Sequence, residues 1–248
     1  MKTVLITGKG RSGTTWLAQI LNTYLHCVYK HEPFLPAKQN GYSKIRAELG
    51  QTSVEALRAR YEKLVASAVY DVDQPPFLAH KSVRTHNEKI THALYGIGTR
   101  VSRLRFLFEL YARPHLHEDA DILIKDVNFP NELLGPLTDV IEPYLVPIVR
   151  NPFANIASHL KGVEIGQFAA VRDADKARVR ELLQGCGDPS LEQYTERLHE
   201  LSPLQFEAVR WRLQVEPLVA FSKSYGRSKL VVYEDLCENP MAITQGLF

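Results

Sequence analysis

A glycine-rich turn near the N-terminus constrains the fold of this chain more than any other stretch. The turn reads Gly8-Lys9-Gly10-Arg11-Ser12-Gly13-Thr14-Thr15-Trp16, and an apolar, β-branched run over residues 2–7 precedes it. Apolar residues at helical spacing follow over residues 17–25, so the pattern predicts a strand, a tight turn and a helix. This geometry points backbone N–H groups and a helix N-terminus at one place, which makes an anion site.

The positive charge of this turn stands at a different position from that of a nucleoside triphosphatase P-loop. Gly8 and Gly13 keep the four-residue gap of a P-loop, but Thr14-Thr15 replaces the Lys-Ser or Lys-Thr pair that should follow. The cation has moved forward to Arg11. The turn therefore suits a phosphate group, while an ordinary strand-to-helix turn is the alternative interpretation of its glycines alone.

The string Arg11–Trp16 closely resembles the 5′-phosphosulfate loop of sulfotransferases that use 3′-phosphoadenosine 5′-phosphosulfate (PAPS). The resemblance implies that Arg11 contacts the phosphosulfate and stabilises the oxygen that leaves with adenosine 3′,5′-bisphosphate. It also implies that Thr14 and Thr15, with the N–H of Gly13, hold the 5′-phosphate and that Trp16 stacks on adenine. The residues expected to bind the donor in this loop are Gly10, Arg11, Ser12, Gly13, Thr14, Thr15 and Trp16.

A second motif begins at Arg150, which ends an expected strand and precedes a helix that starts at Pro152. Ser158 lies eight positions after Arg150. Sulfotransferases of this family hold the 3′-phosphate of the nucleotide with an arginine and a serine at this spacing. An arginine suits a phosphate because its planar guanidinium donates two hydrogen bonds at once.

The resemblance spans nearly the whole chain and implies a single sulfotransferase domain over residues 1–248. Residues 232–236 are similar to a Tyr-Glu-Asp-Leu segment after a late strand of the family, and we interpret them as scaffold. The chain stops at Phe248, inside an expected helix, whereas family members usually continue. We therefore expect that the C-terminal end is truncated or that the basic loop closing over the nucleotide is supplied otherwise.

The acceptor must lose a proton, so a general base is expected. Cytosolic members place a histidine in a Lys-Thr-His triplet, and the matching positions here are Lys125, Asp126 and Val127, without a histidine. Carbohydrate-type and some bacterial members use a glutamate after the second strand, and Glu32 fits that position. His31 and His80 are the alternative bases. Lys125 is expected either to approach the sulfonate as a second cation or to pair with Asp126.

Strand-like and helix-like segments alternate along the chain, which predicts an α/β three-layer sandwich with a mainly parallel sheet, similar to P-loop nucleoside triphosphatases. Residues 83–117 are expected to form two helices, broken near Gly96 and Gly98, which are either a lid over the acceptor site or a surface helical pair with solvated arginines. We expect a polar loop over residues 35–50, further helices over 173–184 and 190–201, and a long helix over 203–225. The expected strands are residues 2–7, 27–30, 77–81, 121–125 and either 145–149 or 229–233, with the central strand left open.

Composition bounds the remaining classes of function. The 248 residues carry a net charge of only +2, which argues against a nucleic-acid partner. Three scattered cysteines form no disulfide framework, and the sequence has neither a signal peptide nor an apolar run of about 20 residues, so we expect a cytoplasmic protein without a membrane span. No metal-ligand cluster is evident, and the oligomeric state stays open.

These expectations define one main function and two alternatives. The first is transfer of a sulfuryl group from PAPS to a hydroxyl or amine of a small-molecule or glycan acceptor, with Arg11, Glu32 and Lys125 as the catalytic residues and no metal. The second is a P-loop kinase acting on a small molecule or nucleotide, against which the position of Arg11 argues. The third is a nucleotide-binding module without catalysis, against which Glu32 argues.

Overall fold

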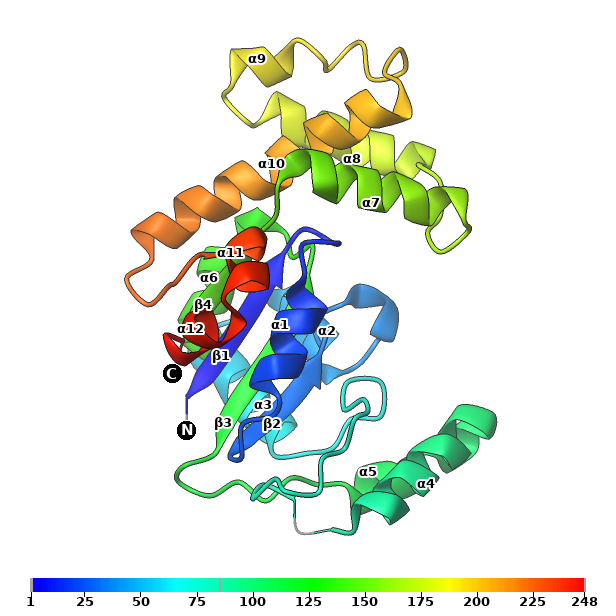
Figure 1. Ribbon diagram of the computed structural model, residues 1–248, viewed down its shortest axis with the longest axis vertical. Helices are drawn as coiled ribbons and strands as arrows, with labels where there is room; N and C mark the ends of the chain where they lie inside the picture. The colour runs from blue at the N-terminus through cyan, green and yellow to red at the C-terminus, as the bar shows by residue number, and fades with distance from the viewer. Residues whose placement is uncertain (1, 85, 248) are drawn as a thin grey trace.

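A five-stranded, all-parallel sheet forms the centre of the computed structural model, which describes residues 2–84 and 86–247 (Figure 1). The strand order is β2-β3-β1-β4-β5, so the strand that leads into the glycine turn is central. Because all strands run in one direction, their carboxyl ends meet at one edge, where ligands of open α/β sheets bind. The strands are β1 (Thr3–Gly8), β2 (Cys27–His31), β3 (Asp121–Val127), β4 (Tyr144–Val149) and β5 (Val231–Val232).

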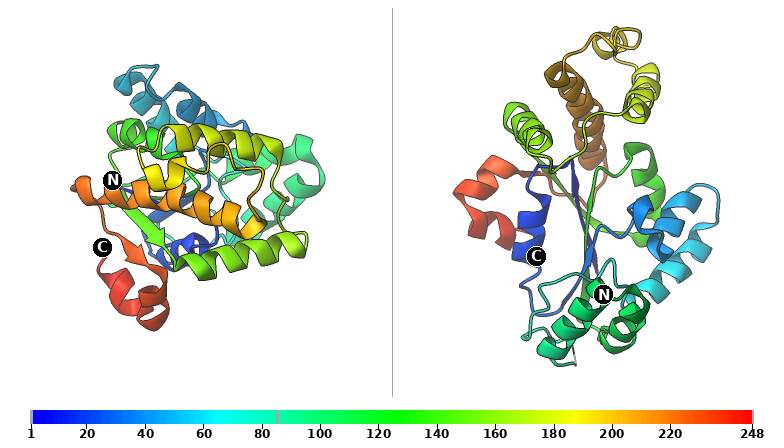
Figure 2. Two further views of the ribbon diagram at one scale, coloured as in Figure 1. Left: turned by 90° about the horizontal axis from the view of Figure 1, so that it is seen from above. Right: turned by 90° about the vertical axis from the view of Figure 1, so that its right-hand side faces the viewer.

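Helices cover both faces of the sheet, as the view along the sheet in Figure 2 shows. The predicted three-layer α/β architecture is therefore confirmed. Apolar side chains alternate between the two faces of each strand: on β3, Ile122 and Ile124 belong to one core and Leu123 to the other. One face carries α1 (Thr14–Leu21), α11 (Tyr233–Glu238) and α12 (Pro240–Gln245), and the other carries α2 (Gly41–Glu48), α3 (Val54–Val65) and α6 (Leu134–Ile141).

The crossover between β4 and β5 forms a separate helical layer beyond the carboxyl edge of the sheet (Figure 1). Its helices have their own apolar core, in which Leu183, Leu198 and Phe206 are buried. Pro152 is the first residue of α7, as predicted, and the side chain of Asn151 caps that helix. The helices are α7 (Pro152–Glu164), α8 (Asp173–Gln184), α9 (Pro189–Glu192) and α10 (Pro203–Ser224).

The segment predicted as a lid forms two helices that project beyond the β2 edge (Figure 1): α4 (Glu88–Arg100) and α5 (Arg105–Tyr111), joined by the short 3₁₀ helix η2 (Ser102–Leu104). The predicted break near Gly96 and Gly98 is wrong, because α4 runs through both glycines. A Cβ atom on Gly98 would lie 2.5 Å from the Tyr70 ring, so this glycine lets α4 pack closely on that tyrosine. The role of this insert as a lid stays a prediction.

Three further expectations for the elements are wrong. Residues 77–81 form no strand, because side chains anchor this segment instead: Phe77 packs among Tyr70 and Phe108, and Lys81 bonds to the Cys27 carbonyl. The supposed loop over 35–50 contains η1 (Pro36–Lys38) and α2, and the helix expected over 190–201 ends at Glu192. The two strands offered as alternatives, 145–149 and 229–233, both occur as β4 and the short β5. The remaining 3₁₀ helix is η3 (Asn131–Leu133).

Candidate donor-binding and catalytic site

The glycine turn leaves the N-terminus of α1 open. Gly13 is the N-cap residue of α1 with φ 92°, and it provides no side-chain cap. The N–H of Leu17 bonds to the Gly13 carbonyl at 3.0 Å, so the amides before Leu17 have no carbonyl partner within the helix. A Cβ atom on Gly13 would lie 2.3 Å from the Tyr233 ring, which gives a second reason for glycine here. The loop has the free donors and the dipole that an anion needs.

Arg11 and Ser158, predicted from separate motifs, touch each other. The Nε of Arg11 donates a hydrogen bond to the Oγ of Ser158 at 3.0 Å. The Arg11 guanidinium also lies 5.5 Å from the centre of the Phe168 ring, a cation–π distance. Arg11 itself has φ 70°, a left-handed backbone conformation that residues other than glycine rarely adopt. The surrounding contacts therefore have to stabilise it.

Arg150 lies against the same loop. Its Nη1 donates to the Arg11 carbonyl at 3.1 Å, and its guanidinium lies 4.6 Å from the centre of the Tyr233 ring. The Nε of Arg150 is buried and has no hydrogen-bond partner within the described residues. A buried, unpaired donor on a charged group is costly, and an anion bound beside it would remove that cost. The structure thus joins the two motifs that lie about 140 positions apart in the sequence.

Tyr233 is part of this site, although its segment was expected to be scaffold. Its ring contacts Trp16 edge-to-face, with 6.0 Å between ring centres, besides lying under Arg150 and over Gly13. Trp16 remains 39% exposed, so part of its surface is open to a ligand. An aromatic residue directly after the last parallel strand, at the ligand edge, was the signal available in the sequence.

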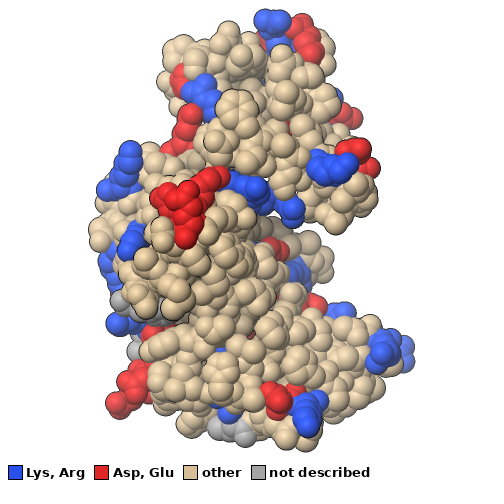
Figure 3. All heavy atoms as spheres, viewed as in Figure 1, with Lys and Arg blue, Asp and Glu red and all other residues tan. Residues whose placement is uncertain are grey.

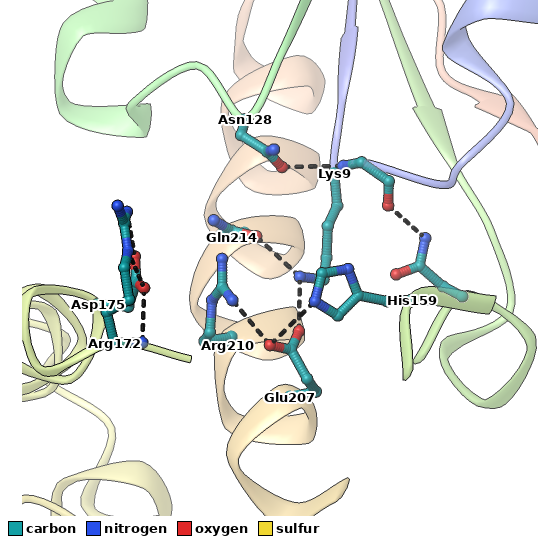
Figure 4. Close-up of polar contacts among 10 residues, drawn as sticks. Lys9, Asn128, His159, Arg172, Asp175, Glu207, Arg210 and Gln214 are labelled. Carbon is teal, nitrogen blue, oxygen red and sulfur yellow. Dashed lines mark hydrogen bonds and ion pairs between the residues drawn. The ribbon is translucent and has the colours of Figure 1, made fainter. Parts of the chain in front are cut away.

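Lys9 points away from the loop into the helical layer, which its position in the sequence did not predict. Its Nζ lies 3.3 Å from Oε2 of Glu207 and 3.2 Å from Oε1 of Gln214, both on α10 (Figure 4). The two charged side chains are 4% and 1% exposed. Burial lowers the pKa of Lys9, while the charge of Glu207 opposes that shift.

Glu207 connects three elements around the candidate donor loop, residues 8–16 (Figure 4). Besides Lys9 it bonds Arg210 at 2.7 Å and lies 3.5 Å from Nε2 of His159 on α7. The His159 ring stacks on Phe168 with 5.5 Å between ring centres and 10° between planes, and Phe168 in turn lies beside Arg11. Burial lowers the pKa of His159 in spite of Glu207. This buried cluster therefore positions the loop and α7 relative to each other.

Two asparagines fix the backbone of the loop from opposite sides. Asn128, directly after β3, accepts a hydrogen bond from the N–H of Gly10 at 2.8 Å. Asn155 on α7 donates to the Gly10 carbonyl at 3.0 Å and to the Ser12 hydroxyl at 3.2 Å. The Oδ1 of Asn155 is buried without a partner in the described part of the chain. The loop is thus held in place before any ligand binds, which lowers the entropy cost of binding.

Glu32 and Lys125 form an ion pair at the ends of β2 and β3. The Nζ of Lys125 donates to Oε1 of Glu32, and the Lys125 side chain is 4% exposed. The alternative in which Lys125 pairs with Asp126 is wrong, because the two side chains point to opposite faces of β3 and Asp126 accepts from the Phe34 amide at 2.9 Å. Burial alone would raise the pKa of Glu32, but the hydrogen bond and charge of Lys125 outweigh it and lower that pKa.

The two alternative bases differ in position. His31 lies beside Glu32, with 4.0 Å between its Nε2 and Oε1 of Glu32, and burial with the charge of Lys125 lowers its pKa to about 4. His80 bonds to the carbonyl of Thr23, beyond the C-terminal end of α1. Since α1 runs back from the donor loop, this end lies at the amino edge of the sheet, away from the loop. His31 is therefore near the candidate site and His80 is not.

The Glu32–Lys125 pair and the Arg11 cluster share the carboxyl edge of the sheet. In the strand register, Lys125 lies opposite Ile6 and Val127 lies opposite Gly8, so the pair sits one strand away from the loop. No hydrogen bond or ion pair joins Glu32 to Arg11 directly within residues 2–84 and 86–247. Figure 3 shows a hollow between the helical layer and the rest of the molecule, with Lys and Arg side chains at its rim.

Residues 2–84 and 86–247 hold no group of three or more His, Cys, Asp or Glu side chains placed to ligate a metal ion. None of their helices combines the length and apolar character needed to cross a bilayer.

Comparison with known proteins identifies the fold. The sequence matches no protein-family model and no curated protein. The sulfotransferase domain from the curacin biosynthetic pathway aligns over 100% of this chain and 72% of its own length, with a TM-score of 0.50 at 12% identity. The sulfotransferase domain of the Synechococcus PCC 7002 olefin synthase aligns over 99% of this chain and 71% of its own length, with a TM-score of 0.45 at 14% identity. The sulfotransferase from Alicyclobacillus acidocaldarius aligns over 99% of this chain and 78% of its own length, with a TM-score of 0.46 at 12% identity.

The chain therefore has the fold of a sulfotransferase domain, and the fold implied by the resemblance of its loop is confirmed. At these identities the likeness concerns the fold alone. What the chain does must be argued from its own side chains.

Proposed function

We propose that this protein is a PAPS-dependent sulfotransferase. The observation that carries the proposal is the convergence of Arg11, Arg150 and Ser158 on one open helix N-terminus, with the Arg150 Nε buried and unpaired. Two arginines and a row of free amides make a site for a ligand with more than one anionic group. A nucleotide phosphorylated at both the 3′ and 5′ positions has this chemistry.

The residues of the site match the separate chemical groups of the donor. Arg150 and Ser158 would hold the 3′-phosphate, the amides of Gly13 and the following residues would hold the 5′-phosphate, and the exposed part of Trp16 would receive the adenine. When bound, PAPS supplies an activated sulfuryl group. Arg11 would stabilise the charge on the oxygen that leaves, which is the largest contribution expected of such a site.

Proton transfer from the acceptor is assigned to Glu32. Its lowered pKa keeps it ionised near neutral pH, but the same ion pair with Lys125 makes it a weaker base. We infer that Lys125 turns from Glu32 toward the sulfonate when the donor is bound, which would free the carboxylate and raise its basicity. Its neighbour His31 is the alternative base, since its lowered pKa leaves it neutral at pH 7.

No observation favours a kinase. The lysine of the loop, Lys9, is buried against Glu207 and does not reach the mouth of the loop, where a P-loop lysine would contact a triphosphate. We further propose that the enzyme works without a metal, in the cytoplasm, on a hydroxyl or amine of a small-molecule or glycan acceptor.

The proposal is tested by nucleotide binding and transfer. Calorimetry should show tighter binding of adenosine 3′,5′-bisphosphate than of adenosine 5′-monophosphate, without magnesium. Arg150→Ala should weaken bisphosphate binding about ten- to a hundredfold, because a charge-assisted hydrogen bond contributes roughly 1.5–3 kcal/mol, and should barely change binding of the monophosphate. Arg197→Ala, at an exposed position of the helical layer, is the matched control.

Three outcomes would contradict the assignment in different ways. Equal loss for both nucleotides would remove Arg150 from the 3′-phosphate site. Stabilisation by magnesium–ATP but not by the bisphosphate would favour the kinase. Bisphosphate binding without transfer from labelled PAPS to any compound in a small-molecule extract would leave a binding module.

A further inference from the structure

A cavity of about 510 Å³ lies beside the donor loop and has no role in the assignments above. It opens between α8 and α10 on one side and α2 with the β3–α6 connection on the other. Its wall includes Asn128, which holds Gly10, and Gln214, which holds Lys9. The cavity therefore shares two side chains with the supports of the loop, and its volume is in the range of small-molecule sites.

Arg46 is the unusual member of this wall. Its guanidinium lies 5.4 Å from the centre of the Phe129 ring, and it donates one long hydrogen bond, at 3.4 Å, from Nη1 to the Phe34 carbonyl. Among the described residues no carboxylate forms an ion pair with it, whereas Arg58 and Arg60 nearby in the sequence both have such partners. Most of the N–H donors of Arg46 thus remain available to a ligand.

The other charges of the cavity compensate each other. Arg178 pairs with Glu132, which also lines the cavity, and with Glu181 at 3.1 Å. Of the three charged side chains that line the cavity, Arg46, Glu132 and Arg178, only Arg46 forms no ion pair within the described residues, although the charges of Asp126 and Glu132 act on it. The rest of the surface is largely apolar and includes Phe129, Leu182, Leu213 and Pro217. Such a cavity suits a molecule with an apolar body and one negative group.

The position of Arg46 connects the cavity to the candidate base. The carbonyl that accepts from Arg46 belongs to Phe34, two residues after Glu32. The amide of Phe34 is fixed in turn by Asp126 at the end of β3. Arg46 thus reaches from the wall of the cavity to the turn that carries Glu32.

We propose that this cavity binds the acceptor and that the acceptor is a hydroxylated carboxylate with an apolar body, whose carboxylate is held by Arg46. This inference rests on the proposed function. A planar guanidinium stacked on an aromatic ring holds a carboxylate through two parallel hydrogen bonds and leaves the far end of the molecule free. The hydroxyl would then point toward the carboxyl edge of the sheet.

Binding of matched probes tests the proposal. The probes are para-hydroxyphenylpropionate and hydroxydecanoate, each compared with its primary amide and with its phosphate-ester counterpart, by calorimetry with and without adenosine 3′,5′-bisphosphate. The acids should bind and the amides should bind about tenfold or more weakly, since the amide cannot make a charge-assisted pair. Phosphate esters that bind better than the acids would overturn the choice of a carboxylate.

Variants separate the cavity from the donor site. Arg46→Gln should lose acid binding about tenfold or more while the bisphosphate affinity stays unchanged, and Arg60→Gln on α3 is the matched control. Cys186→Trp, which fills the cavity from the α8–α9 turn, should block the acids in the same way. Unchanged acid binding in both variants, or acids that bind no better than amides, would refute the proposal.

Transfer assays distinguish the failure of this inference from the failure of the proposed function. With labelled PAPS, the acids should be sulfated faster than the amides in the wild-type protein and not in Arg46→Gln. Sulfation of amides and acids at equal rates would refute the acceptor class but keep the sulfotransferase. Acid binding through Arg46 in a protein that never binds the bisphosphate would refute the proposed function and the acceptor role together.

Discussion

Replacing Glu207 by glutamine should strongly destabilise the protein although it changes one atom. Glu207 is fully buried on α10 and faces Lys9 at 3.3 Å and Arg210 at 2.7 Å. Glutamine keeps the shape and one acceptor oxygen but removes the charge. Lys9, whose side chain is 4% exposed, would then be a buried cation without a counter-ion.

The distance of the pair sets the size of the effect. At 3.3 Å and an effective dielectric constant of about 20, the attraction between Lys9 and Glu207 is about 5 kcal/mol before the cost of desolvation. Breaking one partner of a buried pair typically costs about 3–5 kcal/mol, because the other charge stays behind. In a chain of this size we expect the midpoint of thermal unfolding to fall by roughly 10 °C.

The pH dependence has a defined sign. Burial and Arg210 hold the pKa of Lys9 below the usual 10.5, and Glu207 is the group that raises it. In Glu207→Gln the folded-state pKa of Lys9 falls further below that of the unfolded chain. The unfolded chain then binds more protons than the folded one, so the stability of the variant should rise as the pH increases toward 10.5 and fall as the pH decreases.

Urea unfolding at several pH values measures both effects. Glu216→Gln is the matched control, because Glu216 lies on the same helix in an exposed ion pair with Arg212 and should change stability little. Combining Glu207→Gln with Lys9→Met should recover most of the loss. Stability of Glu207→Gln within about 0.5 kcal/mol of wild type, or no recovery in the double variant, would refute the buried-pair reasoning.

Three further predictions concern the site. Arg11→Ala should lower kcat more than it raises the KM for PAPS, since its contact is expected to strengthen as charge develops on the leaving oxygen; steady-state kinetics with an unchanged kcat would make Arg11 a binding residue only. Glu32→Gln should reduce turnover about 10²–10⁴-fold, the typical cost of losing a general base, with PAPS affinity within a few-fold; near-normal turnover would move the role to His31. Burial raises the pKa of Asp126 to about 7, so this group alone makes the stability of the protein fall as the pH rises from about 4 to 7. Asp126→Asn keeps the acceptor for the Phe34 amide, and its urea unfolding should show a smaller decline over this pH range. An unchanged slope would contradict the raised pKa.

Much of the donor site could be predicted from the sequence because its parts are local. A glycine turn between a strand and a helix creates free amides whatever surrounds it, and Pro152 marks the start of α7 by its own backbone. The alternation of strands and helices was enough to predict the parallel sheet, since parallel strands need crossovers. Strand 77–81 was the exception, because an apolar run does not reveal that side chains alone will anchor it.

The packing of the elements fixes which distant groups meet and which side chains leave the site. The residues alone predict a phosphate-type loop, an Arg150–Ser158 pair and a carboxylate at a strand end. Only the packing of α7 and α10 over the sheet could bring Ser158 to Arg11 and draw Lys9 away to Glu207. These contacts depend on the direction of side chains across separate elements, which local periodicity does not encode. The ion pair of Glu32 with Lys125 and the lack of an ion pair at Arg46 within the described residues could therefore not be predicted from the residues alone.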